Sequence, residues 1–128
     1  MSVPAVGDRL AVVEVETISR ERLREFAVVS GDDNPVHLDD EAARRGGLDG
    51  VVTHGMLVMA HLGRLVASAG ALRSFKVRFT APTPVGSRVT CGGKVVAVEA
   101  GTARLQVTAV REDGVTVARG EAVVEVRA

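Results

Sequence analysis

The sequence predicts an α+β fold in which an antiparallel five-stranded sheet wraps around one long apolar helix. The first observation is a segment, residues 54–70, that carries apolar side chains on nearly every side of a helix and must be covered by other structure. The second is a series of four segments after this helix, and one before it, in which apolar and polar residues alternate. Alternation with a period of two is typical of strands that bury one face.

The N-terminal part of the chain predicts a strand followed by two helices. Residues 9–16 alternate between apolar and polar side chains, which favours a strand. Ser19 can cap the helix that follows, and this helix should stop before Gly31. A shorter helix is expected over residues 39–45, where a pair of glycines ends the pattern.

Residues 54–70 are predicted to form the long helix. Only His61, Arg64 and Ser68 interrupt its apolar surface, and their spacing places them on one narrow stripe. A membrane-spanning helix is not expected, because the run is too short for a hydrocarbon core of ~30 Å and contains His61 and Arg64. The segment is therefore interpreted as a core helix that other structure wraps on most sides.

Four strands after the long helix can supply this wrapping. Two prolines separate the first two strands, and residues 100–101 and 113–114 predict hairpin turns. The last strand starts on odd-numbered apolar positions and continues on even-numbered ones, which implies a bulge near Arg119-Gly120. The expected inward-facing residues are Phe75, Val77, Phe79, Val89, Cys91, Gly93, Val95, Ala97, Leu105, Val107, Ala109, Val115, Val117, Ala122, Val124 and Val126.

Composition limits the kinds of protein that this chain can be. A length of 128 residues and a mass of 13.4 kDa suit one domain over residues 1–128. Sixteen basic and sixteen acidic residues cancel, so neither nucleic acid nor a membrane is an expected partner. Cys91 is the single cysteine, which excludes a disulfide framework and a cysteine-rich zinc module. The N-terminus has no pattern of a secretory signal, and a cytoplasmic protein is expected.

The stretch SGDDNPVH, residues 30–37, gathers a hydroxyl, carboxylates, turn-forming residues and a histidine in eight positions. Further carboxylates follow at residues 39–41. Such a stretch has three interpretations: a solvated loop, a metal site or an acid–base site.

This loop and a second segment together resemble a known signature. Residues 26–39, FAVVSGDDNPVHLD, and THGM at residues 53–56 are similar to the signature of the MaoC-like, R-specific enoyl-CoA hydratase family. The similarity covers essentially the whole chain, including KVRFTAPTPVG at residues 76–86. The chain is especially similar to the single-hotdog 3-hydroxyacyl-thioester dehydratase subunits of actinobacterial type II fatty-acid synthesis. The resemblance implies the hotdog fold, in which a sheet wraps around one long helix.

The resemblance also implies a reaction, the R-specific hydration of trans-2-enoyl thioesters or the reverse dehydration of (R)-3-hydroxyacyl thioesters. The substrate would be carried on CoA or acyl-carrier protein, and no cofactor is expected. Asp32 and His37 are the catalytic pair that the resemblance assigns. Such a reaction needs a base for water and an acid for the α-carbon, and the Asn34-Pro35 turn can make the two side chains converge. Which of the two takes the proton from water is left open.

Gly55 is the candidate for charge stabilisation at the thioester carbonyl. It lies at the start of the long helix, where unpaired N–H groups and the helix dipole favour negative charge. Without a Cβ atom, its N–H can approach a carbonyl oxygen closely and form an oxyanion hole. Close helix packing alone would also explain a glycine at this position.

Neighbouring polar residues are assigned supporting roles. Ser30 and Asn34 are expected to order the loop by local hydrogen bonds, and Asp39 is expected to cap a helix or order the loop. His54 is expected to be a buried, hydrogen-bonded residue at the entry to the long helix. The remaining side chains are interpreted as solvated charges (Asp33, Asp40 and Glu41), a core or interface histidine (His61) and a small buried hydrophobe (Cys91).

A metal site formed by Asp32, His37, Asp39 and His54 is the main alternative for these side chains. Their types suit a divalent cation. No two of them lie on a helix at i, i+4, and the family that the chain resembles uses no metal. We therefore assign no metal ligand from the sequence.

Two other functions are compatible with a hotdog fold. A thioesterase would place a carboxylate on the long helix, but residues 54–70 contain neither Asp nor Glu. A non-catalytic subunit that shapes the acyl tunnel of its partner would lack the catalytic pair, whereas Asp32 and His37 are both present. A single hotdog exposes a sheet edge and a helix surface. We therefore expect a homodimer, a heterodimer with a second hotdog subunit, or a higher oligomer.

The acyl chain is expected to lie along the long helix. Some related hydratases carry a serine one or two turns beyond the HGM segment, but residues 60–63 read AHLG here, so no such role is assigned. The sequence leaves open the acyl-chain length, the choice between CoA and acyl-carrier protein, the pathway direction and the identity of a partner subunit.

Overall fold

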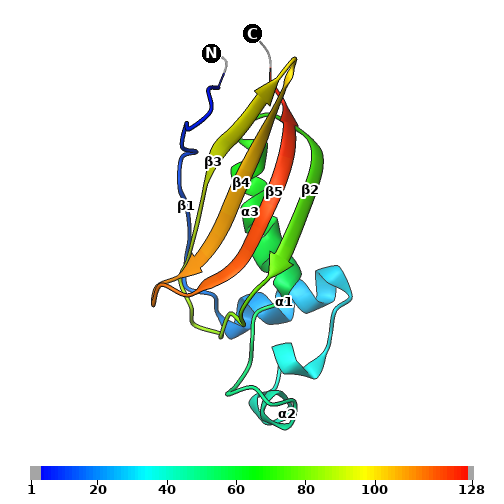
Figure 1. Cartoon of the computed structure of the whole chain (residues 1–128). Helices are drawn as coiled ribbons and strands as arrows, with labels where there is room; N and C mark the ends of the chain where they lie inside the picture. Colours follow the sequence, from blue (N-terminus) through cyan, green and yellow to red (C-terminus); the bar gives the residue numbers. More distant parts are fainter. Residues whose placement is uncertain (1–3, 127–128) are drawn as a thin grey trace.

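The computed structural model describes residues 4–126 and confirms the α+β fold (Figure 1). All neighbouring strands of its five-stranded sheet are antiparallel, in the order β1-β3-β4-β5-β2. The expectation about a secretory signal falls partly on residues 1–3, which lie outside the described residues. The elements are β1 (Val13–Val15), α1 (Arg20–Ser30), the 3₁₀ turn η1 (Pro35–His37), α2 (Asp40–Arg45), α3 (Gly55–Ala67), β2 (Ala71–Phe79), β3 (Val89–Glu99), β4 (Thr102–Arg111) and β5 (Thr116–Glu125).

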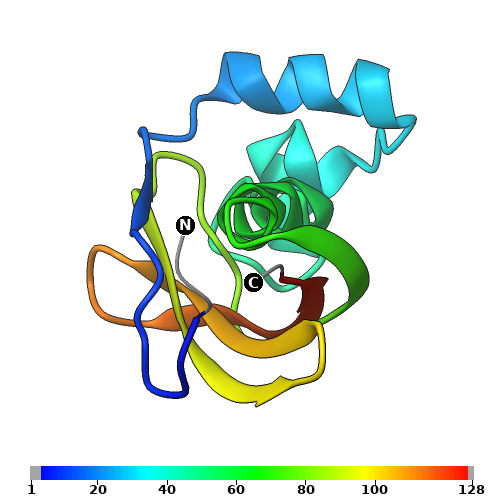
Figure 2. The ribbon, with the colours of Figure 1, turned by 90° about the horizontal axis from the view of Figure 1, so that it is seen from above.

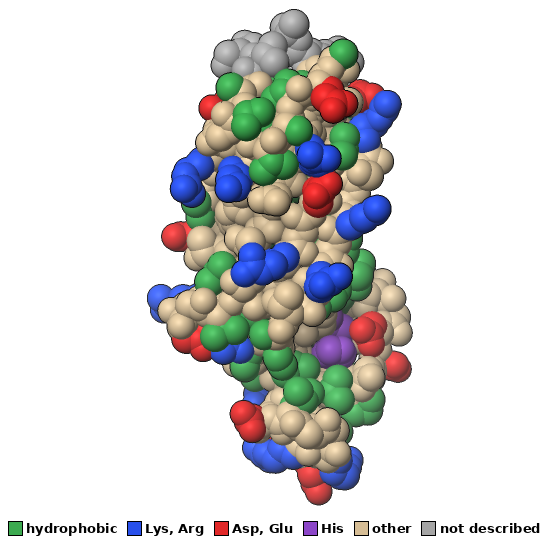
Figure 3. Space-filling view, in the orientation of Figure 1, with side chains coloured by type: hydrophobic (Ala, Val, Ile, Leu, Met, Phe, Trp, Pro, Cys, Tyr) green, Lys and Arg blue, Asp and Glu red, His purple; other side chains and the backbone are tan. Residues whose placement is uncertain are grey.

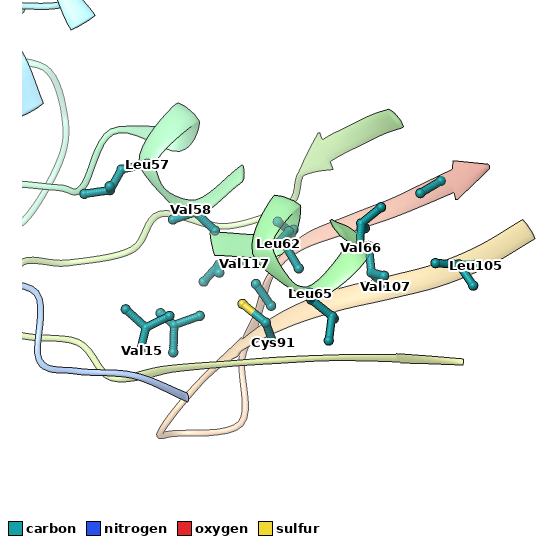
Figure 4. Close-up of a cluster of buried hydrophobic side chains, with 14 of the residues drawn as sticks. Val15, Leu57, Val58, Leu62, Leu65, Val66, Cys91, Leu105, Val107 and Val117 are labelled. Carbon is teal, nitrogen blue, oxygen red and sulfur yellow. The ribbon is translucent and has the colours of Figure 1, made fainter. Parts of the chain in front are cut away.

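The sheet curls around α3, which lies against its concave face (Figure 2). Leu62 and Leu65 of α3 are fully buried among side chains of the sheet, which include Cys91 and Leu105 (Figure 4). Because such cores are close-packed, α3 is held firmly and its first residue has a defined place at one end of the sheet. The elements α1, η1 and α2 gather at that same end (Figure 1).

One side of α3 is not covered within a single chain. Met56 is 58% exposed, Ala60 and Ala67 are also exposed, and Met59 is half-buried. The prediction that other structure wraps this helix on most sides is confirmed, and a single stripe of α3 is left exposed in the single chain. β2 lies at the edge of the sheet, and its residue Leu72 is 52% exposed.

The strands differ from the prediction in several places. Register shifts between Leu72 and Ser74 and between Val95 and Ala97 are not predicted. The first strand is only Val13–Val15, and Arg9 makes an isolated bridge to Lys94 in place of a continuous ladder. The bulge in the last strand lies at Val117 and not near Arg119-Gly120. Ala109 pairs with Ala118 while the next residue of β4 pairs with Thr116, so Val117 is the extra residue and both it and Ala118 are buried.

The predicted boundaries of α1 are confirmed, whereas α3 ends at Ala67, earlier than the predicted residue 70. Ser19 precedes α1, and its Oγ accepts a hydrogen bond from the Arg22 N–H at 3.1 Å. Gly31 ends the helix in a left-handed conformation with φ 78°. Within residues 4–126, no helix is long and apolar enough to cross a membrane.

Candidate active site

Polar side chains hold the loop that follows α1. Ser30 Oγ donates a hydrogen bond to the Phe26 carbonyl at 2.6 Å and accepts one from the Asp32 N–H at 3.1 Å. The Gly31 N–H donates to the Ala27 carbonyl at 3.0 Å, which closes the helix. The chain therefore leaves α1 in a defined direction, and Asp32 is positioned immediately after the helix.

Asn34 orders the turn that leads to His37. Its Oδ1 accepts a hydrogen bond from the Val36 N–H at 3.1 Å, and Pro35 occupies the first position of η1. The Asn34 N–H donates to Asp32 Oδ1 at 3.3 Å. This turn reverses the chain and brings His37 back toward Asp32.

Asp32 and His37 face each other across a short gap. Asp32 Oδ2 lies 3.7 Å from His37 Nε2, which is too long for a direct hydrogen bond. The Asp32 side chain is 49% exposed and that of His37 is 13% exposed, so solvent and ligands can reach the gap from the carboxylate side. One oxygen atom, from water or from a substrate hydroxyl, can contact both groups.

The other nitrogen of His37 is anchored to the main chain. His37 Nδ1–H donates a hydrogen bond to the Val52 carbonyl at 2.8 Å. Because a carbonyl can only accept, Nδ1 carries the proton, and Nε2 of the neutral ring presents a lone pair to the gap. The Val52 N–H in turn donates to the Val36 carbonyl at 3.1 Å. Val52 therefore both accepts a hydrogen bond from the His37 turn and donates one to it.

His54 contacts both members of the pair. Its fully buried ring donates a hydrogen bond from Nε2 to the Asp32 carbonyl at 2.9 Å. The ring stacks on that of His37, with centroids 4.0 Å apart, and meets Phe26 edge-on at 4.9 Å. The sequence predicts a buried, hydrogen-bonded His54, but no local signal could indicate the stack on His37.

Gly55 is the first residue of α3, and no acceptor for its N–H lies among the described residues. An added Cβ atom would lie 3.2 Å from two carbons of the Phe79 ring, which is tighter than ordinary contact. The packing explanation for this glycine therefore has a physical basis. The role of its N–H toward a ligand remains a proposal.

A hollow of about 480 Å³ lies beside Gly55. Val58, Phe79 and Val117 contribute apolar walls. Thr53 also lines the hollow, and its buried Oγ1 has no hydrogen-bond partner among the described residues. The hollow thus offers an apolar surface to a group bound next to the start of α3.

Asp39 and Asp40 have structural contacts. Asp39 caps α2, with Oδ1 accepting from the Glu41 N–H at 3.1 Å, and it does not join the catalytic candidates. Asp40 accepts from the Val51 N–H at 2.9 Å and from Arg20 Nη2 at 2.8 Å. The interpretation of Asp40 as a solvated charge is therefore wrong, because its contacts lie 11 and 20 residues away in the chain.

These contacts also affect the charge of Asp40. The Val51 amide and the Arg20 guanidinium hold the pKa of the Asp40 carboxyl below its usual value. Asp33 and Glu41 are exposed, as expected for solvated charges.

The side chains that could hold a metal ion are Asp32, His37 and His54, whose ligand atoms lie within 4.8 Å of one another. In each histidine, one nitrogen already donates to a carbonyl group. The two rings stack with an interplanar angle of 23°, and two stacked imidazoles cannot easily aim both remaining lone pairs at one ion. The arrangement fits a metal ion poorly and leaves the gap between Asp32 and His37 to a bound oxygen atom.

The model of the MaoC like domain family matches residues 3–117 of this chain. The match contains the loop with Asp32 and His37 and the start of α3. The chain belongs to this family.

Individual relatives agree with this assignment. The 3-hydroxyacyl-thioester dehydratase Z of Mycobacterium tuberculosis is 34% identical over 104 residues, which cover 74% of this chain and 69% of the relative. The structure of an (R)-hydratase from A. caviae involved in PHA biosynthesis superposes with a TM-score of 0.87 and 26% identity, covering 96% and 97% of the two chains. The ChsH1–ChsH2 complex of M. tuberculosis shares the fold, with a TM-score of 0.87, 19% identity and coverage of 98% and 100%.

Proposed function

We propose that this protein is a hydro-lyase that adds water to trans-2-enoyl thioesters or removes it from (R)-3-hydroxyacyl thioesters. The observation that carries the proposal is the 3.7 Å gap between Asp32 Oδ2 and His37 Nε2, in a loop that a family signature already singles out. The dehydratase and hydratase named among the relatives support the same reaction class.

The gap between Asp32 and His37 supports a simple movement of protons. With a neutral imidazole and an ionised carboxylate, both atoms that face the gap are acceptors. The hydroxyl of a water molecule held there adds to C3 of the enoyl thioester, and the remaining proton moves to one of the two groups. The same group then delivers that proton to C2, so the atoms of one water molecule are added in full. Dehydration follows the same steps in reverse.

Gly55 is proposed to bind the thioester oxygen. As the hydroxyl adds to C3, negative charge develops on the carbonyl oxygen, and the free N–H at the start of α3 can stabilise it until C2 takes up the proton. Gly55 directly follows His54, whose ring contacts His37, so this donor lies at the same end of the molecule as the pair. The acyl or pantetheine portion next to the carbonyl would occupy the hollow lined by Phe79 and Val117.

The proposal includes a substrate carried on CoA or acyl-carrier protein and requires neither metal nor organic cofactor. Water and the two side chains supply every proton and oxygen atom of the reaction. A cytoplasmic location, expected from the sequence, also remains part of the proposal.

The test is the loss of ultraviolet absorbance of crotonyl-CoA, combined with chiral analysis of the product. General acid–base catalysis contributes about 10²–10⁴-fold, so Asp32→Asn and His37→Gln should each lower kcat by at least about 100-fold. Asp33→Asn is the matched control, because Asp33 is an exposed carboxylate in the same loop. No turnover of CoA or carrier-protein thioesters by the wild type would refute the proposal, and so would full activity of both variants. Release of free thiol in place of hydration would favour a thioesterase.

A second copy of this chain is the proposed partner. β2 is a sheet edge, and the exposed side of α3 carries Met56, Ala60 and Ala67 next to it in the fold. Pairing two β2 strands about a twofold axis would satisfy both free edges and cover both helices. The relative that forms a complex of two different subunits supports assembly of this kind, with a second hotdog subunit as the alternative partner.

Light scattering coupled to size exclusion tests this assembly. Met56→Lys places a charge on the exposed side of α3 and should shift the dimer to monomer. Val115→Lys is the control, because Val115 is exposed at the hairpin after β4 and lies on neither α3 nor β2. A wild-type chain that runs as a monomer at all concentrations would refute the homodimer.

A further inference from the structure

Two arginines on the outer face of the sheet lie side by side without a counter-charge. Arg78 of β2 and Arg119 of β5 are direct cross-strand partners, and both are exposed. Thr108 of β4 continues the same row. Like charges that face each other across a strand pair destabilise a sheet, so this arrangement costs stability in the absence of a ligand.

Other arginines of this sheet are neutralised. Arg104 Nε lies 3.8 Å from Glu121 Oε1, and Arg73 forms an ion pair with Glu125. Within residues 4–126, neither Arg78 nor Arg119 has a carboxylate within 4.0 Å. The two arginines are therefore the ones on this sheet that remain available to an external anion.

The arginines border a shallow hollow of about 500 Å³. Lys76 adds a third cation to its lining, and Thr108 adds a hydroxyl. Glu121 is the one carboxylate in this lining, and it lies near Arg104. Guanidinium groups bind phosphate oxygens by paired, charge-assisted hydrogen bonds, so the hollow has the chemistry of a phosphate site.

This hollow adjoins the proposed active site. Arg78 immediately precedes Phe79, and side chains alternate along a strand, so Phe79 packs over Gly55 while Arg78 points to the outer face. On β5, the bulge at Val117 turns this side chain to the hollow beside Gly55, while Arg119 lines the outer hollow. Figure 3 shows Lys and Arg side chains on the sheet directly above a histidine that opens on the same view.

We propose that Arg78 and Arg119 bind the phosphate at the end of the pantetheine arm of the substrate. This inference rests on the proposed function, because that function makes the substrate a pantetheine thioester. CoA and acyl-carrier protein both present a phosphate at this end of the arm. With the carbonyl at Gly55, the arm passes Phe79 at the end of β2 and places its phosphate on the outer face. Pairing of two chains through the β2 edge would leave these outward side chains free.

Steady-state kinetics with thioesters of the same acyl group on CoA, on acyl-carrier protein and on pantetheine without phosphate test the proposal. In Arg78→Gln/Arg119→Gln, the ratio of kcat/KM for the CoA thioester to that for the pantetheine thioester should fall about tenfold. This fall should come from a higher KM for the CoA thioester, with kcat unchanged. The effect should also weaken with added salt. Arg73→Gln/Lys94→Gln removes the same charge from the same sheet at residues outside the hollow and should leave this ratio unchanged.

The carrier-protein thioester identifies the source of the phosphate. If this ratio of kcat/KM falls for both carriers, the arginines bind the phosphate that CoA and acyl-carrier protein share. If it falls for one carrier alone, the arginines bind the phosphate of that carrier. The proposal would be overturned if kcat/KM fell equally for the pantetheine and CoA thioesters. It would also be overturned if the ratio of kcat/KM to that of the pantetheine thioester stayed unchanged for both carriers. Calorimetric titration with free CoA separates this inference from the proposed function. Weaker binding in Arg78→Gln/Arg119→Gln than in the control supports the phosphate site even without turnover, and equal binding by an active enzyme whose ratio for the carrier-protein thioester is also unchanged refutes it.

Discussion

The imidazole of His54 lies against that of His37, with ring centroids 4.0 Å apart and an angle of 23° between the planes. The same His54 ring donates a hydrogen bond to the Asp32 carbonyl at 2.9 Å. A single buried side chain at the entry to α3 therefore positions the ring of one catalytic candidate and the backbone of the other. The distance between Asp32 Oδ2 and His37 Nε2 depends on the place of α3, and so on the core of the sheet.

His54→Phe tests this positioning role. Phenylalanine keeps a ring against His37 but removes the N–H that binds the Asp32 carbonyl. Loss of one hydrogen bond, about 1 kcal/mol, should lower kcat about fivefold with little change in KM. His61→Phe is the control, because His61 is half-buried on α3, the helix that follows His54, and lies outside the site. A fall in apparent kcat that is fully explained by the loss of folded protein in a thermal melt would contradict a positioning role.

Gly55→Ala separates packing from oxyanion binding. The new Cβ would lie 3.2 Å from the Phe79 ring, and such overpacking costs about 1–3 kcal/mol of stability. Phe79→Ala removes this contact, so Gly55→Ala/Phe79→Ala should recover the stability of Phe79→Ala in urea unfolding. If Gly55 binds the thioester oxygen, the double variant should still be at least tenfold less active than Phe79→Ala, because the methyl group hinders approach to the N–H. Equal activity would show that this glycine serves packing only.

The features that the sequence predicts correctly are mostly local. Ser19 and Asp39 cap helices, and Ser30 and Asn34 bond to groups between two and four residues away. Side chains of this kind act on their own backbone, so their effect can be read from the order of residues. Alternation also predicts four long strands, because one face of each contributes to the same core.

The features that the sequence does not predict join distant segments. Asp40 binds the Val51 amide, His54 binds the Asp32 carbonyl 22 residues away, and Phe79 lies over Gly55. Each depends on how α3 is placed against the sheet, which no local pattern specifies. The sequence predicts the wrong position for the bulge at Val117 for the same reason. Val117 and Ala118 are both buried, and only their pairing with β4 shows which of them is the extra residue.

Asp40 should make stability depend on pH in the acid range. The Val51 amide and Arg20 lower the pKa of this carboxyl in the folded chain below 3.8. The ionised form is therefore favoured by folding, so its contribution is complete above the unfolded pKa and is lost as pH falls through the folded pKa. Asp40→Ala should be less stable than the wild type at pH 7, and this difference in urea unfolding should shrink below about pH 3.8. A difference that stays constant down to pH 2 would contradict this assignment, and Asp33→Ala serves as the control.

Cys91 should be chemically inert in the folded protein and should weaken the fold at alkaline pH. Its side chain is fully buried, and burial raises the pKa of the thiol from 9.0 to about 11. A thiol reagent at pH 8 should therefore modify the native chain at least about 10³-fold more slowly than the urea-unfolded chain, since only opened molecules react. Between pH 9 and about pH 11 the unfolded chain loses this proton while the folded chain keeps it, so the free energy of unfolding should fall as pH rises. Cys91→Ala should lack this part of the pH dependence, and rapid modification of the native wild type would show instead that β3 opens locally around Cys91.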